Sequence, residues 1–233
     1  FKKGRIFLYF REFKERGCKY FKTDDLKKCS RFWIILFKTI LSKLYHWKIY
    51  VVGSVEYQYP NHLFQAGYFL DKKYYDENTI DFKHLLLSEK NQSLLKDIQN
   101  SNSVGVHIRR GDYMTKQNLV IFGNICTQKY SYDAIRIITE KVNDAVFYVF
   151  SDDISWVQTH LDIPNAVYVN WNTGESSIYD MYLMSSCKYN IIANSTFSYW
   201  AARLNKKTNM VIYPSKWYNT FTPDIFPESW CGI

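Results

Sequence analysis

The chain has 233 residues, of which 47% are hydrophobic and 22% are charged. This composition excludes an intrinsically disordered chain, because it can bury the core of one large domain or of two small ones. The net charge of +8 is uneven, since residues 1–50 hold fourteen Lys/Arg and four Asp/Glu, whereas the remainder of the chain is net −2.

The basic first 50 residues predict a helix up to Gly17 and one or two further helices over 26–48. The most apolar stretch, Phe32–Phe37, is closed by charged residues after six positions, far short of the roughly 20 residues that span a bilayer. Without a visible signal peptide, the chain is expected to be cytoplasmic, with peripheral membrane contact through these residues; a core-facing amphipathic helix is the alternative. No nucleic-acid motif accompanies the charge, so no nucleic-acid partner is expected.

The cysteines are odd in number and widely spaced, and no Cys-x-x-Cys or Cys/His cluster is present. This pattern favours neither a disulfide framework nor a zinc site and is typical of a reducing compartment. The five positions are Cys18, Cys29, Cys126, Cys187 and Cys231.

The first part of the chain predicts a small amino-terminal domain. A β-rich run covers 49–52, an aromatic loop covers 64–76, and a helix covers 85–98. This helix leads into the central strand, and the domain boundary is expected near residues 80–100, so that residues 1–95 form the first domain and residues 96–233 the second.

The second domain shows a regular alternation of elements. A long loop is expected after its first strand, and strands and helices of this length predict a parallel, doubly wound, Rossmann-like sheet of the α/β class. The expected strands are 104–108, 145–150, 166–170, 189–193 and 210–213, and the expected helices are 130–143, 153–161, 177–186 and 196–204.

Two adjacent arginines, Arg109 and Arg110, follow the strand at 104–108, and Gly111 then breaks the strand. The arginines therefore lie at the carboxyl end of a strand, where open α/β sheets bind their ligands. Two guanidinium forks suit a diphosphate, because each donates paired hydrogen bonds to phosphate oxygens. An ordinary ion pair with Asp112 is the alternative.

Two further strand ends carry polar residues. Ser151-Asp152-Asp153 follows the strand at 145–150, and residues 194–198 (Asn-Ser-Thr-Phe-Ser) follow the strand at 189–193. Each segment is also explained as a helix cap. Because the carboxyl ends of parallel strands share one edge, all three segments are expected to converge there.

These motifs carry a resemblance to a known family. His-Ile-Arg-Arg-Gly-Asp-Tyr at 107–113, Phe-Ser-Asp-Asp-Ile-Ser-Trp at 150–156 and the segment 180–200 resemble the α-1,2-fucosyltransferases of glycosyltransferase family eleven. The resemblance runs from about Gly67 to the carboxyl end. It implies a GT-B-like fold and inverting transfer of L-fucose from GDP-β-L-fucose to the 2-hydroxyl of a galactose-containing acceptor. It also implies that no metal or other cofactor is required.

The resemblance gives roles to the residues of the first motif. Arg109 is expected to hold the β-phosphate as GDP departs, and Arg110 to support it or to hold the loop through Asp112. His107 is expected to contact the donor ribose or phosphate, with a buried structural histidine as the alternative. Asp112 is the candidate general base, or else an ion-pair partner of Arg110.

The other two motifs would bind the nucleotide. Asp180 resembles the aspartate with which related enzymes read guanine, whose edge presents two donors. Asp152 would contact the nucleotide or only cap its helix, and the segment 115–123 is the suggested acceptor loop. Phosphate is expected at the turn formed by Asn194, Ser195, Thr196 and Ser198.

One feature of the family is missing from the sequence. Its members begin with a strand and a Gly-Gly-Leu-Gly-Asn-Gln-like loop, which this chain lacks. We interpret the chain as amino-terminally truncated. Two hypotheses follow: an active fucosyltransferase, or a catalytically silent fragment that binds GDP or a GDP-sugar.

Overall fold

The computed structural model describes residues 21–23, 50–52, 64–66, 80–82 and 84–233. The chain divides into two compact units, residues 1–84 with 223–225 and residues 85–222 with 226–233. The boundary expected after residue 95 falls within helix α3 (Glu89–Asn100), which belongs to the second unit.

The described part of the first unit includes two strand pairs. The strand expected at 49–52 is observed as β2 (Tyr50–Val52), whereas the expected loop at 64–76 begins with strand β3 (Phe64–Ala66). The helices expected up to Gly17 and over 26–48 lie outside the described residues. One pair is antiparallel and the other parallel: β1 (Phe21–Thr23) with β4 (Ile80–Phe82), and β2 (Tyr50–Val52) with β3 (Phe64–Ala66). Across the described residues, no helix has the length and hydrophobicity required to cross a membrane.

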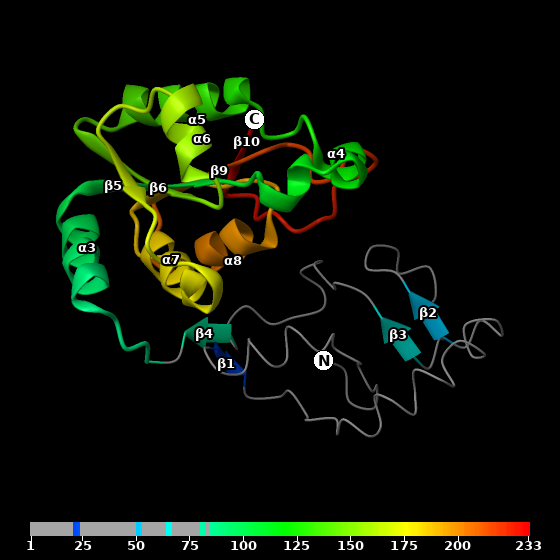
Figure 1. The fold of residues 1–233 in the computed structure, drawn as a ribbon, viewed down its shortest axis with the longest axis horizontal. Coiled ribbons are helices and arrows are strands. Elements are labelled where there is room, and N and C mark those ends of the chain that lie inside the picture. The colour runs from blue at the N-terminus through cyan, green and yellow to red at the C-terminus, as the bar shows by residue number, and fades with distance from the viewer. Residues whose placement is uncertain (1–20, 24–49, 53–63, 67–79, 83) are drawn as a thin grey trace. The chain divides into compact units, whose positions relative to one another are not determined.

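The second unit is built on a six-stranded parallel sheet with the order β10-β9-β8-β5-β6-β7 (Figure 1). The predicted Rossmann-like parallel sheet and α/β class are therefore confirmed, and the short edge strand β10 was not predicted. The strands are β5 (Asn102–Ile108), β6 (Ala145–Ser151), β7 (Ala166–Val169), β8 (Tyr189–Ile191), β9 (Met210–Tyr213) and β10 (Cys231–Gly232).

The helices follow the predicted alternation, with one difference. The segment expected to be a long loop after β5 contains η3 and α4. Thr115 stabilises the start of α4 by accepting a hydrogen bond from the Asn118 amide at 3.4 Å. The elements are η3 (Gly111–Met114), α4 (Lys116–Phe122), α5 (Gln128–Lys141), α6 (Ile154–His160), η4 (Gly174–Ser176), α7 (Ser177–Met184) and α8 (Thr196–Leu204).

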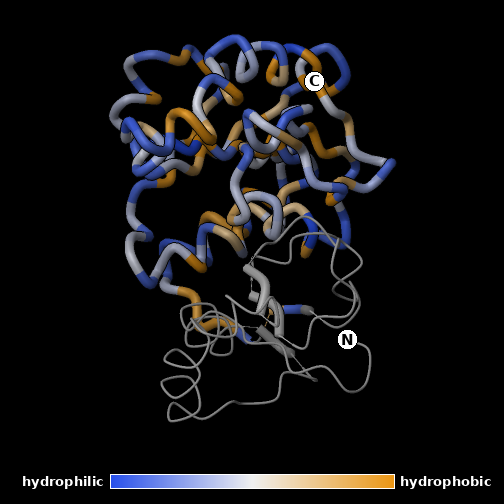
Figure 2. The backbone as a smooth tube through the Cα atoms, turned by 90° about the vertical axis from the view of Figure 1, so that its right-hand side faces the viewer, coloured by the Kyte–Doolittle hydropathy of each residue, from blue (hydrophilic) through white to orange (hydrophobic). Residues whose placement is uncertain are grey.

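Helices cover both faces of the sheet. Val106 and Val149 pack with Ile138 of α5 on one face, while Tyr148 packs with Leu183 of α7 on the other. Burial on both faces explains why β6 is an almost continuous apolar run. Hydrophilic stretches of this unit lie mainly along its outer loops (Figure 2).

The topology creates a switch point beside β5. From β5 the chain passes through α5, β6, α6 and β7 in one direction, whereas β8 and β9 lie on the other side of β5. Helices α5 and α6 cover one face of the sheet, and α3, α7 and α8 cover the opposite face (Figure 1). In open α/β sheets, ligands bind at this point, outside the carboxyl ends of the strands.

Candidate functional site

The three polar strand ends meet at the switch point, as expected from the sequence. The Tyr113 hydroxyl, just after β5, donates a hydrogen bond to the Asn194 carbonyl after β8 at 2.9 Å. The Arg110 amide donates to Asp152 Oδ1 after β6 at 2.9 Å. Hydrogen bonds between residues that are 42 and 81 positions apart in the sequence therefore join these strand ends into one edge.

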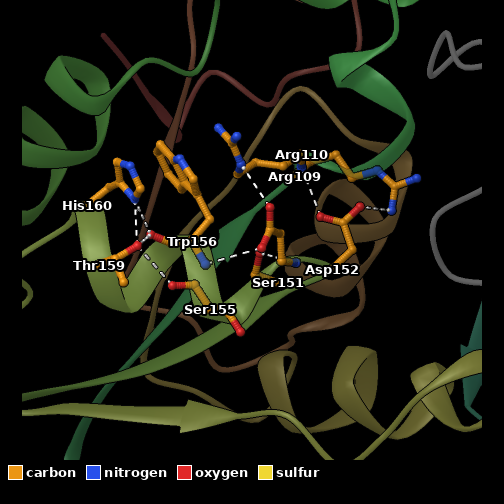
Figure 3. Close-up of polar contacts among 9 residues, drawn as sticks. Arg109, Arg110, Ser151, Asp152, Ser155, Trp156, Thr159 and His160 are labelled. Carbon is orange, nitrogen blue, oxygen red and sulfur yellow. Dashed lines mark hydrogen bonds and ion pairs between the residues drawn. The ribbon is translucent and has the colours of Figure 1, made fainter.

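Arg109 lies between two carboxylates at this edge. Its Nη2 is 2.6 Å from Asp112 Oδ1 and its Nη1 is 2.8 Å from Asp152 Oδ2, and Figure 3 shows the pairing with Asp152. The Arg109 side chain keeps 32% of its surface exposed. The two short charge-assisted bonds orient the guanidinium, and its exposure leaves it accessible to an anionic ligand.

Arg110 points away from Arg109 and makes different contacts (Figure 3). Its Nε is 3.3 Å from Asp153 Oδ2, and its guanidinium lies 3.6 Å from the ring centroid of Trp156. The expected pairing of Arg110 with Asp112 is therefore wrong, because neighbouring residues at a strand end project in opposite directions. The two guanidinium groups do not form a paired fork.

The adjacent carboxylates of Asp152 and Asp153 have different hydrogen-bond partners. Asp153 caps α6 by accepting a hydrogen bond from the Trp156 amide at 3.2 Å. Asp152 instead accepts from Arg109 and from the Arg110 amide, so the alternative in which it caps the helix is wrong. Gly111 makes room for it, since a Cβ at that position would lie 2.3 Å from Asp152 Oδ2.

His107 is buried at the end of β5, with 7% of its surface exposed. Burial, helped by the positive charge of Arg109, lowers the pKa of His107 to about 3, so the ring is neutral near pH 7. Its Nδ1 has no hydrogen-bond partner among the described residues, and its ring centroid lies 5.0 Å from that of Phe197. A purely structural histidine would be expected to have this nitrogen satisfied.

The amino end of α8 is uncapped by side chains. Ser195 occupies the N-cap position but makes no capping bond, and Asn194 instead donates to the Trp217 carbonyl at 3.1 Å. The expectation that Asn194 or Ser195 caps this helix is therefore wrong. Ser198 is buried and bonds to Ala193, whereas Thr196 is exposed. The amides of the first turn are left available for an anion.

Asp180 lies in the first turn of α7, before β8, as predicted. Its side chain is 9% exposed, and its Oδ1 accepts a hydrogen bond from Asn172 Nδ2 at 2.7 Å. Burial raises the pKa of Asp180 to about 7, against the opposing effect of the Asn172 bond. The carboxylate is therefore buried, and its ionised form predominates only above about pH 7.

Several residues of this edge were not identified from the sequence. Tyr113, Trp156, Asn172 and Asn91 each act through a side chain that reaches another element. An isolated Tyr, Trp or Asn in a local pattern gives no signal of such a contact. Tyr113 and Trp156 lie within the motifs at 107–113 and 150–156, and only that position in the sequence could have indicated a role for them.

The suggested acceptor segment, 115–123, forms α4 and exposes apolar side chains. Val120 is 75% exposed, and Ile121 and Phe221 are also exposed. Asn219 Nδ2 donates to the Val120 carbonyl at 2.9 Å, so α4 is joined to the carboxyl-terminal segment.

The charges of this edge suit an anion carrying a hydrogen-bonding base. Arg109 and the uncapped end of α8 offer positive charge and donors, while Asp180 offers an acceptor. In the described part of the chain, no three His, Cys, Asp or Glu side chains are placed to share a metal ion.

Comparison with known proteins identifies relatives of this chain. The family model described as "Glycosyl transferase family 11" matches residues 26–233. An alpha-1,2-colitosyltransferase of Escherichia coli is 35% identical over 78% of this chain and 63% of its own length. The O-antigen biosynthesis glycosyltransferase WbnK of Escherichia coli is 43% identical over 52% of this chain and 40% of its own length.

A mammalian relative is also similar. The galactoside alpha-(1,2)-fucosyltransferase 2 of Pongo pygmaeus is 28% identical over 64% of this chain and 48% of its own length. The matches thus span between 40% and 63% of the length of these three relatives.

Proposed function

The chain belongs to glycosyl transferase family 11, and we propose that it transfers L-fucose from GDP-β-L-fucose to the 2-hydroxyl of a galactoside acceptor, with inversion. The family match and the α-1,2 linkage in the names of two relatives support this reaction. The observation that carries the proposal is the placement of Arg109 at the switch point of the sheet, on the same edge as the uncapped end of α8, which Tyr113 joins through its hydrogen bond to the Asn194 carbonyl.

Departure of GDP is the step that this geometry would assist. As the acceptor oxygen attacks the anomeric carbon, the bond to the β-phosphate breaks and negative charge grows on that phosphate. Arg109 would stabilise this charge together with the amides of the first turn of α8. The Thr196 hydroxyl would add a further donor, while the buried Asn194 and Ser198 hold the turn. Ser195 would contribute through its backbone.

Asp112 remains our candidate for the base that accepts the proton of the acceptor hydroxyl. Its pairing with Arg109 places it next to the group that would hold the leaving phosphate. Its side chain is 57% exposed, so an acceptor can reach it. Proton removal and charge stabilisation would then occur at adjacent groups.

The remaining polar groups would bind the nucleoside. Asp180 would accept hydrogen bonds from the guanine edge, and neutral His107 would contact the ribose or a phosphate through an imidazole nitrogen. Asp152 would act on the nucleotide through Arg109, which it orients. The acceptor would lie along α4, whose exposed apolar side chains can pack against a sugar ring.

A second donor is favoured by one observation, the 35% identity to an alpha-1,2-colitosyltransferase. The same reaction with GDP-colitose in place of GDP-fucose would use the same phosphate and base contacts. We also propose that the protein is cytoplasmic, because its three described cysteines, Cys126, Cys187 and Cys231, are free thiols.

A donor screen tests the proposed function. The chain would be incubated with a β-galactoside and, in turn, GDP-fucose, GDP-colitose, GDP-mannose and a UDP-sugar, and the product would be analysed for linkage and anomeric configuration. We expect α-1,2 transfer from GDP-fucose or GDP-colitose alone. Transfer from GDP-mannose in preference to both would refute the proposal. Calorimetry with GDP would identify the silent fragment, which would bind GDP without any turnover.

A further inference from the structure

A chain of hydrogen bonds reaches Asp180 from two other elements. Trp171 Nε1 donates to Asn91 Oδ1 at 2.7 Å, and Asn91 Nδ2 donates to Asn172 Oδ1 at 2.9 Å. Asn172 Nδ2 donates to Asn91 Oδ1 at 3.0 Å and to Asp180 Oδ1 at 2.7 Å. Asn91 is 1% exposed and belongs to α3, whereas Trp171 and Asn172 follow β7.

The Trp171 indole fixes the direction of this series of hydrogen bonds. Trp171 can only donate, so the oxygen of Asn91 must face it and the Asn91 amide nitrogen must face Asn172. The oxygen of Asn172 is then occupied, and its amide nitrogen is turned toward the carboxylate. The opposite orientation of Asn172 would bring two oxygens together at Asp180.

The direction of these hydrogen bonds determines which oxygen of Asp180 remains available to a ligand. Both hydrogens of Asn172 Nδ2 are used, one on Asn91 and one on Asp180. Among the described residues, none donates a hydrogen bond to Asp180 Oδ2. The carboxylate is therefore held by one oxygen and retains acceptor capacity for a ligand that carries N–H donors.

The elements around α7 also carry titratable groups, but the pKa of Asp180 is set by burial and by the Asn172 bond. Those groups, among the described residues of the elements that contact α7, are Glu89, Lys90, Lys96 and Asp97 of α3, His107 of β5, Tyr148 of β6, Glu175 of η4, and Tyr199 and Arg203 of α8. A pH response of Asp180 can thus be traced to its own carboxylate.

We propose that Asn172, oriented by Asn91 and Trp171, is a positioning residue that holds the Asp180 carboxylate so that it faces the two N–H donors of the guanine edge. The inference rests on the proposed function, because it takes the base of the GDP-linked donor as the ligand of Asp180. Selectivity for guanine would then depend on a residue that need not touch the nucleotide.

The test measures GDP affinity by calorimetry between about pH 5.5 and about pH 9. In the parent chain the affinity should fall as the pH drops through about 7, where Asp180 is protonated. In Asn172→Ala the midpoint should move up by about 0.5–1 unit, because the carboxylate loses its donor. The parent should bind GDP at least about tenfold tighter than inosine diphosphate, which lacks the 2-amino group, and the variant should lose most of this preference.

Trp171→Phe provides a milder variant that keeps an aromatic ring beneath Lys90, whose Nζ lies 3.8 Å from the Trp171 ring centroid. It removes only the donor to Asn91 and should move the midpoint upward by less than Asn172→Ala does. Asp180→Asn should remove the contribution of the carboxylate to the titration and leave only that of the GDP terminal phosphate, whose second pKa is about 6. Asn102→Ala is the matched control, because the Asn102 side chain donates to the Asn143 carbonyl at the amino end of the sheet, and it should leave the midpoint unchanged.

The outcomes separate the two proposals. If the parent binds GDP and both Asn172→Ala and Trp171→Phe keep its midpoint and its preference over inosine diphosphate, the positioning role is overturned while the proposed function stands. If the parent binds no GDP at any pH, the proposed function and the positioning role both fail.

Discussion

Two junctions at the carboxyl edge of the sheet handle charge in opposite ways. After β5 and β6, Arg109 is shared by two carboxylates and remains one-third exposed. In the first turn of α7, Asp180 is buried and is held by the neutral amide of Asn172, which follows β7. At the first junction, Arg109 can exchange one of its carboxylate partners for a phosphate. At the second, Asn172 holds the Asp180 carboxylate in one orientation as an acceptor. A phosphate group is bound mainly by charge, whereas a guanine base is bound by hydrogen bonds of defined direction.

The largest effect should follow Arg109→Ala. Loss of the guanidinium removes the charge that would stabilise the leaving phosphate, so transfer should fall by about 10²–10³-fold. Arg109→Lys should recover little of this, since an ammonium group cannot form the paired bonds of a guanidinium. Steady-state kinetics measure both variants. Arg136→Ala, which removes a surface ion pair with Glu140, is the control, and equal rates in Arg109→Ala and Arg136→Ala would remove Arg109 from the mechanism.

A smaller effect is expected from Gly111→Ala. The added Cβ would lie 2.3 Å from Asp152 Oδ2, so that carboxylate must move and Arg109 must lose its orientation. Transfer should fall on the order of 10-fold to 100-fold, while thermal unfolding changes little. Ser155→Ala, at an exposed position of α6, serves as the control. A Gly111→Ala variant with parental kcat and KM would show that Asp152 does not position Arg109.

Asp180→Asn should stabilise the fold in a pH-dependent way. The folded-state pKa of about 7 exceeds the ordinary value of 3.8, so burial of the ionised group costs stability as the pH rises through this range. The variant should therefore gain about 2–4 kcal/mol over the parent near pH 8 and almost nothing near pH 4. Urea unfolding at both pH values measures the difference, and an equal gain at both would contradict a buried, ionised Asp180.

The smallest effect is expected from removal of metal ions. If the guanidinium and the amides of α8 supply the charge for phosphate departure, no divalent cation is needed. Treatment with EDTA should then leave the transfer rate unchanged, and added Mg²⁺ should not raise it. A rate that collapses with EDTA and returns with Mg²⁺ would show that Arg109 is insufficient.

Much of the fold of the second unit was predictable because its signals are local. Apolar runs such as 145–150 and the helical periodicity of 130–143 gave elements within two residues of those observed. The error after β5 arose because α4 is short. The Thr115 cap is a weak local signal, and contacts such as Asn219 with Val120 come from a segment about 100 residues away.

By itself, the sequence determined that polar residues follow three strands and that these strands belong to one parallel sheet. Tertiary structure decided which partners those residues take. It placed Arg109 between Asp112 and Asp152, and it joined Asn91 to Asn172 across 81 residues. The physical reason is that strand and helix periodicity is written in neighbouring residues, whereas the direction and partner of a side chain depend on elements that only the folded chain brings together.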